Sequence, residues 1–187
     1  MFTAVLRSLA VRAKPRAFKR LIRSESGATA VEFALVAAPF LALLLAIFQT
    51  GIVFLASREL DEVVNSASRT ILTGQAQTSN ITQSQFATWV CQNSTSTLFN
   101  CANFMINVQN YGAFSSTNTA APTLTFNAQG QVTNTWSYSP GGPGDIVVVQ
   151  VMYQWPIVLG PLGFNLSNLS NGNRLLMSTA AFKNEPY

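Results

Sequence analysis

The longest apolar run in the chain covers residues 33–56 and reads FALVAAPFLALLLAIFQTGIVFLA, with no charged side chain. A helix of this length extends about 36 Å, which is enough to cross a hydrocarbon layer of about 30 Å. Residues 40–48 are apolar on every side of such a helix, whereas a helix in a soluble core would carry a polar stripe. A secretory signal peptide has a shorter apolar region of about 7–15 residues. The run therefore predicts one transmembrane helix.

Beyond this run, the apolar positions have the i, i+3, i+4, i+7 spacing of an amphipathic helix. Gly74 suits the C-terminal cap of that helix. We therefore expect one helix from about residue 29 to 73, about 68 Å long, whose outer part packs against the C-terminal part of the chain. The stripe consists of Leu60, Val63, Val64, Ala67, Ile71 and Leu72.

The pattern changes again after residue 74. The polar stretch 75–85 predicts a loop, and Ser84 is expected to cap a short helix that ends at Cys91. Later segments are rich in β-branched and aromatic residues or alternate in polarity, and they predict an α+β head with a small antiparallel sheet. The predicted strands are Phe104–Gln109, a hairpin of Thr123–Asn127 and Gln131–Tyr138, Asp145–Trp155, and Arg174–Phe182.

Composition agrees with a membrane segment and excludes several kinds of chemistry. Charged residues make up 10% of the 187 residues, against about 25% in soluble domains. The absence of histidine excludes Ser-His-Asp and Cys-His catalysis, and two cysteines cannot form a four-thiolate zinc site. No paired-carboxylate or phosphate-binding motif is present. The sequence therefore predicts a structural protein with no catalytic residues, no metal and no cofactor.

The charges are segregated along the chain. Residues 1–26 carry seven basic residues and one acidic residue, whereas residues 28–187 carry four basic and six acidic residues. A basic arm can bind nucleic acid, but this one directly precedes an apolar span. Topology is the better explanation, and we expect no nucleic-acid partner. The positive-inside rule places the N-terminus in the cytoplasm and the head outside.

Cys91 and Cys101 both lie in the exported part of the chain. A disulfide between them is the natural outcome in an oxidising compartment. A catalytic redox pair more often has two residues between its cysteines. We therefore expect a structural disulfide.

The segment Ser26-Gly27-Ala28-Thr29-Ala30-Val31-Glu32-Phe33 closely resembles the processing site of type IV pilin-like precursors. Those precursors have a basic leader, a glycine before the cleaved bond, a small residue after it, and a glutamate as the fifth mature residue. The resemblance implies that a prepilin peptidase cleaves between Gly27 and Ala28. It also implies an assembly role for Glu32 and Phe33, in which Glu32 meets the new N-terminal amine of a neighbouring subunit.

The apolar segment, together with residues 144–153 and 183–187, resembles TadE-like proteins, the minor pilins or pseudopilins of the tight-adherence (Tad, Flp) pilus machinery. This resemblance implies a leader (1–27), a transmembrane and extended helix (28–74) and a periplasmic head (75–187). It implies a bacterial inner-membrane protein that helps to assemble the pilus, and it leaves open whether the protein stays at the membrane or enters the fibre. The implied partners are the prepilin peptidase, a sister pseudopilin, the major Flp-type pilin and the inner-membrane assembly platform. The alternative is an uncleaved single-span protein whose head is an adhesin or another binding module.

Overall fold

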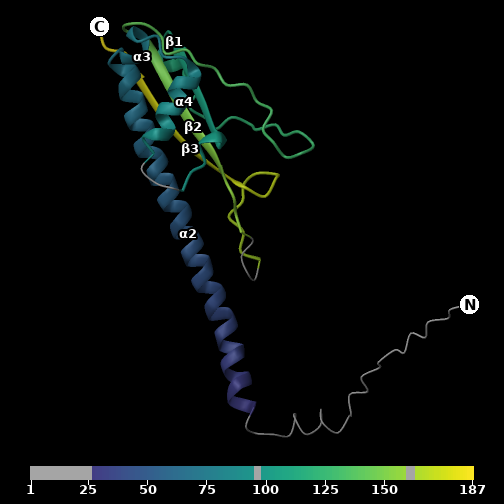
Figure 1. The fold of residues 1–187 in the computed structure, drawn as a ribbon. Coiled ribbons are helices and arrows are strands. Elements are labelled where there is room, and N and C mark those ends of the chain that lie inside the picture. The colour runs from purple at the N-terminus through teal and green to yellow at the C-terminus, as the bar shows by residue number, and fades with distance from the viewer. Residues whose placement is uncertain (1–26, 95–97, 159–162) are drawn as a thin grey trace, which may run out of the picture. The chain divides into compact units, whose positions relative to one another are not determined.

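The computed structural model describes residues 27–94, 98–158 and 163–187 (Figure 1). The chain divides into two compact units, residues 1–44 and residues 45–187. Its helices and its three-stranded antiparallel sheet confirm the predicted α+β class. The main elements are α2 (Ala28–Leu72), α3 (Gln75–Thr78), α4 (Gln83–Gln92), β1 (Phe104–Tyr111), β2 (Ile146–Trp155) and β3 (Arg174–Lys183).

Helix α2 has 45 residues and contains Pro39. It ends where the sequence predicts, because the amide of Gly74 donates to the carbonyl of Ile71 and Gly74 adopts a left-handed backbone with φ of 76°. The predicted apolar stripe is buried, except for Leu72, which is half-buried. Burial on this face also extends back to Val53 and Ala56.

The segment 75–85 is more ordered than the loop that the sequence predicts. It forms the short helix α3 and the start of α4. Thr82, rather than Ser84, caps α4: its hydroxyl accepts from the amide of Gln85, and its own amide donates to the Gln85 side chain. These reciprocal bonds form a capping box. Phe86 and Val90 of this helix are buried.

The sheet has the order β1-β2-β3, with Phe104 opposite Tyr153 and Trp155 opposite Arg174. Strand β2 lies in the middle, and its first eight residues are all buried. This explains why β2 reads as a continuous β-branched run rather than as an alternating one. The burial of eight successive residues means that both faces of β2 are covered.

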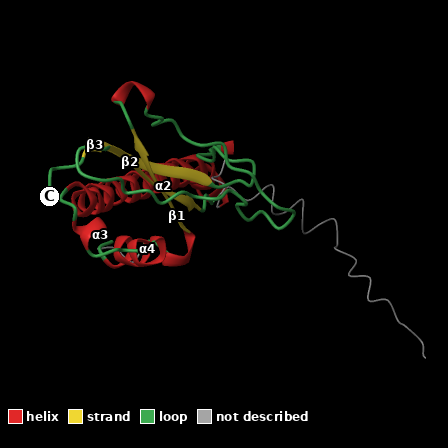
Figure 2. Cartoon of the chain, turned by 90° about the horizontal axis from the view of Figure 1, so that it is seen from above, coloured by secondary structure: helices red, strands yellow, loops and turns green. Residues whose placement is uncertain are grey.

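A hydrophobic core joins the sheet to the helices of the second unit, and these helices and strands are coloured red and yellow in Figure 2. It joins Leu60 and Ile71 of α2, Phe86 of α4, and Val149 and Val151 of β2. The outer part of α2 therefore packs against the head, as the stripe predicts.

The predicted hairpin of residues 123–138 is only partly present. Phe126 and Val132 form an isolated bridge rather than a ladder of paired residues. Tyr138 instead forms a parallel bridge with Val108, so residues 137–139 run along the outer edge of β1. The prediction was wrong for the end of the second arm, because residues 137–138 pair with β1 rather than with the first arm of the hairpin.

Candidate functional site

Helix α2 begins at Ala28, directly after Gly27. Gly27 is half-buried and Ala28 is exposed, and no heavy atom of the described residues lies within 4 Å of the position that a Cβ on Gly27 would occupy. The basic segment that precedes them lies outside the described residues. The bond that resembles a cleavage site therefore sits at the start of a helix, where cleavage would make Ala28 the first residue of that helix.

Glu32 lies one helical turn after Ala28. Because residues four apart share a face of a helix, the Glu32 carboxylate and the backbone nitrogen of Ala28 are on the same side of α2. Glu32 is exposed, and the next side chain, Phe33, is 75% exposed. Both residues are therefore available to a neighbouring molecule rather than used in folding their own unit.

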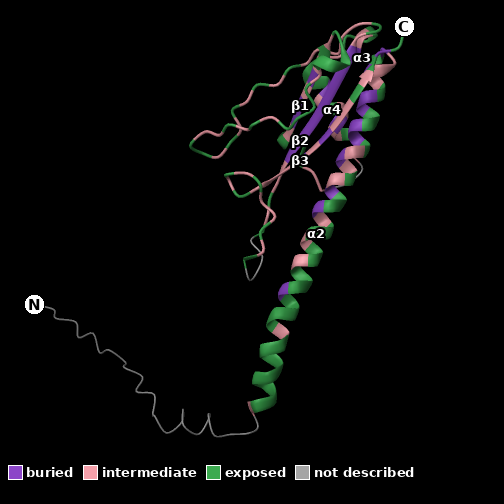
Figure 3. Cartoon of the chain, turned by 180° about the vertical axis from the view of Figure 1, so that it is seen from behind, coloured by how far each residue is buried: buried purple, intermediate pink, exposed green. Residues whose placement is uncertain are grey.

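Exposed apolar residues continue along α2 through its first half, where the ribbon in Figure 3 has mostly the green colour of exposed residues. Among the described residues, α2 is the one helix long and apolar enough to cross a membrane. Its most apolar window has a mean hydropathy of 2.5, and 6% of that window is buried. A core helix would bury such a surface. The exposed residues include Val31, Leu35, Val36, Phe40, Leu41, Leu43, Leu45, Ile47, Phe48, Phe54 and Leu55.

The first charged side chain after the apolar run is Arg58. Its guanidinium lies 5.0 Å from the centre of the Phe54 ring and 3.9 Å from the carboxylate of Asp61. An arginine at this position can pack its stem on apolar surface while its charged end reaches water. Arg58 therefore marks the C-terminal end of the apolar surface.

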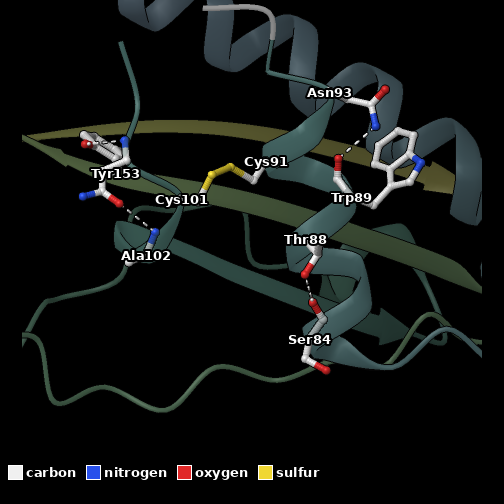
Figure 4. The surroundings of a disulfide bond; sticks show 9 residues. Ser84, Thr88, Trp89, Cys91, Asn93, Cys101, Ala102 and Tyr153 are labelled. Atoms are coloured by element: carbon white, nitrogen blue, oxygen red, sulfur yellow. Dashed lines mark hydrogen bonds between the residues drawn. A yellow bond between two sulfur atoms is a disulfide. The ribbon is translucent and has the colours of Figure 1, made fainter. Parts of the chain in front are cut away.

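Cys91 and Cys101 form the disulfide that the sequence predicts, with their Cα atoms 5.5 Å apart (Figure 4). Cys91 lies near the end of α4, and Cys101 opens the 3-10 helix Cys101–Asn103 before β1. The Tyr153 hydroxyl accepts a hydrogen bond from the amide of Asn100, which fixes β2 beside the bridge. Closing a loop of this size stabilises the fold by about 2–3 kcal/mol in the chain-entropy model.

The C-terminal residues fasten three segments together, a contact that the sequence pattern does not predict. Asn184 is 3% exposed, and its side-chain amide donates to the carbonyls of Pro140 and Gly142 at 2.9 and 3.0 Å. The amide of Glu185 donates to the carbonyl of Leu72, the last residue of α2. The chain end thus ties α2 to the loop that precedes β2.

The described residues hold no group of three or more His, Cys, Asp or Glu side chains that could bind a metal ion. A cleft of about 530 Å³ lies at the end of the sheet where β1 begins and β2 ends. Its lining combines aromatic and amide side chains, among them Phe104, Trp136, Tyr153, Gln154 and Asn173. These groups can form stacking contacts and hydrogen bonds, but they include no nucleophile with a neighbouring base.

Comparison with known proteins finds a family match in the helical part of the chain. Residues 27–69 match the family model described as TadE-like protein. No curated protein and no solved structure matches the chain. The matched segment starts one residue before α2 and covers most of that helix, so the TadE-like resemblance is confirmed for this part of the chain.

Proposed function

Since residues 27–69 form a TadE-like segment, we propose that this chain is a minor pilin or pseudopilin that takes part in assembly of a Tad-type pilus. The observation that carries the proposal is the coincidence of the family match with α2, whose apolar side chains are exposed. Pilin-like subunits use such a helix twice, first as a membrane anchor and then as a contact with neighbouring subunits. The role is structural rather than enzymatic.

In this proposal the apolar part of α2 crosses the bacterial inner membrane. The basic residues before Gly27 hold the N-terminus in the cytoplasm, because Lys and Arg are retained on that side. Arg58 lies at the outer interface, and the head (75–187) folds in the periplasm. An oxidising periplasm agrees with the Cys91–Cys101 disulfide.

A prepilin peptidase then removes the leader (1–27) by cleaving between Gly27 and Ala28. The mature chain would begin in helical backbone and need no rearrangement, because Ala28 is the first residue of α2 and Gly27 before it is 3-10 helical. Cleavage also creates an α-amino group that can pair with Glu32 of a neighbouring subunit. This pairing would neutralise two charges in an apolar environment and set the axial register between helices.

The proposed partners are proteins that can pack against the exposed apolar surface of α2. Exposed Phe33 and the apolar side chains after it offer a packing surface to the helices of a sister pseudopilin and of the major Flp-type pilin. The inner-membrane assembly platform would engage the same subunits before they leave the bilayer. The head is held to residues 53–72 of α2 by its core and by the C-terminal residues, so it would move with this part of the helix.

Processing is tested by replacing the residue before the cleaved bond. Gly27→Leu should leave the chain heavier by the mass of the leader on a denaturing gel of membranes from cells that make the pilus. Gly51→Ala is the matched control, since no atom of the described residues lies within 4 Å of its Cβ position either, and this variant should be cleaved normally. Equal mobility of the Gly27→Leu and unsubstituted chains would contradict processing at this bond.

The role of Glu32 needs a variant that is cleaved but does not assemble. Glu32→Ala should still lose its leader, because the cleaved bond is unchanged, yet it should reduce the number of pili seen by electron microscopy. Glu62→Ala removes an exposed carboxylate further along α2 and should leave piliation normal. Normal piliation of the Glu32→Ala strain would refute the pairing.

The cleft beside Trp136 and Tyr153 favours a second candidate function, recognition of a partner by the head of an uncleaved protein. Sequencing the N-terminus of the protein isolated from cells separates the two candidates. An N-terminus at Ala28 supports the pilin proposal, and an N-terminus at Met1 supports the binding module.

A further inference from the structure

The segment directly after β2 contacts α2 within its apolar run. The side-chain Nε2 of Gln49 donates a hydrogen bond to the backbone carbonyl of Val158, at 2.8 Å. Gln49 lies within the apolar run, and Val158 comes three residues after the end of β2. The two groups belong to the same compact unit, residues 45–187. The head therefore contacts the apolar part of α2 as well as its outer part.

The position of Gln49 along α2 gives the depth of this contact within the apolar run. It precedes Ala56, the last residue of the apolar run, by seven residues, which corresponds to about 10 Å along the axis. It precedes Arg58, the first charged residue, by nine residues, or about 13 Å. When α2 spans a membrane, the headgroup layer on each side occupies about 5–8 Å. Val158 then lies inside the outer interface, at the level of lipid rather than of water.

The residues that follow β2 are suited to contact with lipid. Val158 is 77% exposed, and Pro156 is exposed and has no amide hydrogen to satisfy. No charged residue occurs between Trp155 and Asn173. In lipid every backbone polar group needs a partner from the protein, and Gln49 supplies one to the Val158 carbonyl. The same bond satisfies one of the two amide hydrogens of Gln49.

The end of the sheet nearest this segment is aromatic. The Phe99 ring lies 4.9 Å from the Tyr153 ring and 6.1 Å from the Trp155 ring, measured between centroids. Tryptophan and tyrosine concentrate at membrane interfaces because one part of the ring system is apolar and another is polar. This cluster directly precedes the exposed Val158.

We propose that Trp155–Val158 forms a second membrane contact, in which the segment directly after β2 enters the outer leaflet beside α2 and sets the head against the lipid. The occupant of this surface is lipid, because exposed Val158 continues the exposed apolar band of α2 at the level of Ile47 and Phe48, which are 60% and 68% exposed. The inference rests on the proposed function only in taking α2 as a membrane span. A subunit that enters a pilus would withdraw two apolar elements from the bilayer.

The test places one nitroxide spin label at a time on the full-length chain in phosphatidylethanolamine–phosphatidylglycerol vesicles. Val158→Cys provides the labelling site, and its high exposure means that the substitution does not disturb the core. The native cysteines do not react while they remain in their disulfide. Phe48→Cys is the control for lipid depth, and exposed Thr133→Cys is the control for the head. The readout is collision with dissolved oxygen and with a water-soluble nickel complex.

We expect the label at residue 158 to behave like the label at residue 48. Both should collide less often with the nickel complex and more often with oxygen than the label at residue 133 does. If residue 158 is as accessible to nickel as residue 133 while residue 48 is protected, the span stands and this inference fails. If residues 48 and 158 are both accessible, the span fails as well. Protection at residue 158 that disappears at one chain per vesicle would assign the surface to a neighbouring subunit, which also overturns the proposal.

Discussion

At the scale of single residues, Gly74 meets two requirements at once. Its φ of 76° lies in the left-handed region, and a Cβ at this position would overlap the ring of Tyr187. Gly74→Ala should lower the free energy of unfolding by about 1–2 kcal/mol from the backbone alone. The displaced ring should add to this loss. The measurement is the thermal unfolding midpoint of the full-length chain in detergent micelles.

Gly130→Ala separates the two contributions to the Gly74 effect. Gly130 also has a φ of 76°, but no atom of the described residues lies within 4 Å of its Cβ position, so this variant reports the backbone cost only. Adding Tyr187→Ala to Gly74→Ala should recover part of the difference. Equal losses for Gly74→Ala and Gly130→Ala would show that the Tyr187 contact contributes nothing to stability.

The hydroxyl of Tyr138 is buried and has no hydrogen-bond partner among the described residues. Its ring packs 5.4 Å from the Phe86 ring, and burial raises the pKa of the hydroxyl. Near neutral pH, Tyr138→Phe should leave stability unchanged or raise it by about 1 kcal/mol, because it removes an unpaired polar group. Tyr111→Phe is the control, since it removes a hydroxyl that donates to Gln109, and it should lower stability.

The same hydroxyl gives a pH dependence with a definite sign. Because the folded-state pKa of Tyr138 is raised, the unfolded chain releases this proton first as the pH rises through about 10. Stability should therefore fall above that pH in the unsubstituted chain. Tyr138→Phe should show a smaller alkaline loss in urea titrations at a series of pH values. An identical alkaline loss in both chains would exclude Tyr138 as its source.

At the scale of elements, the local sequence pattern predicts a helix or strand correctly where packing in the fold favours the same structure. The run Asp145–Trp155 predicts β2 to within one residue, because a β-branched run of that length suits a strand buried on both faces. The stripe along α2 predicts its buried face for the same reason. The prediction for the second arm of the 123–138 hairpin failed, because the alternation of polar and apolar residues does not reveal that residues 137–139 pair with the edge of β1.

Contacts between segments that are distant in the sequence cannot be predicted from a local sequence pattern. The Asn184 side chain bonds to the carbonyl of Pro140, 44 residues away, and Gln49 bonds to Val158, 109 residues away. Amide side chains are common on surfaces and pair with many groups, so their partners depend on the assembled fold. In the candidate site, the residues around the cleavage-like bond are predictable from a short motif. The way the head is fastened to α2 is not.

The cap of α4 is an element-scale feature that a substitution can test. Thr82→Ala should cost about 1 kcal/mol in the free energy of unfolding, because it removes the hydroxyl that accepts from the amide of Gln85. Ser84→Ala, at the position that the sequence suggests for the cap, should cost much less. Urea unfolding of the full-length chain in micelles measures both. A larger loss for Ser84→Ala would assign the cap to Ser84.

At the scale of the whole molecule, the charge distribution links topology to assembly. Seven of the 11 basic residues precede residue 27, and they are the charges that favour cytoplasmic retention of the N-terminus. Removing them after insertion would take away the strongest barrier to moving the helix outward. In the proposed function the order of events matters for this reason: the leader would first fix the orientation, and its loss would then free the helix to leave the bilayer with its neighbours.

Loss of the leader should reverse the net charge of the molecule, and isoelectric focusing can detect this. The complete chain has a pI of about 9.4, whereas residues 28–187 carry four basic and six acidic side chains. The processed protein should therefore focus on the acidic side of neutrality, while Gly27→Leu stays basic and Gly51→Ala behaves as the unsubstituted chain does. Intact-mass measurement of the acidic species should place its first residue at Ala28. An acidic species that begins at another residue would refute the proposed bond, and a basic species alone in piliated cells would refute processing itself.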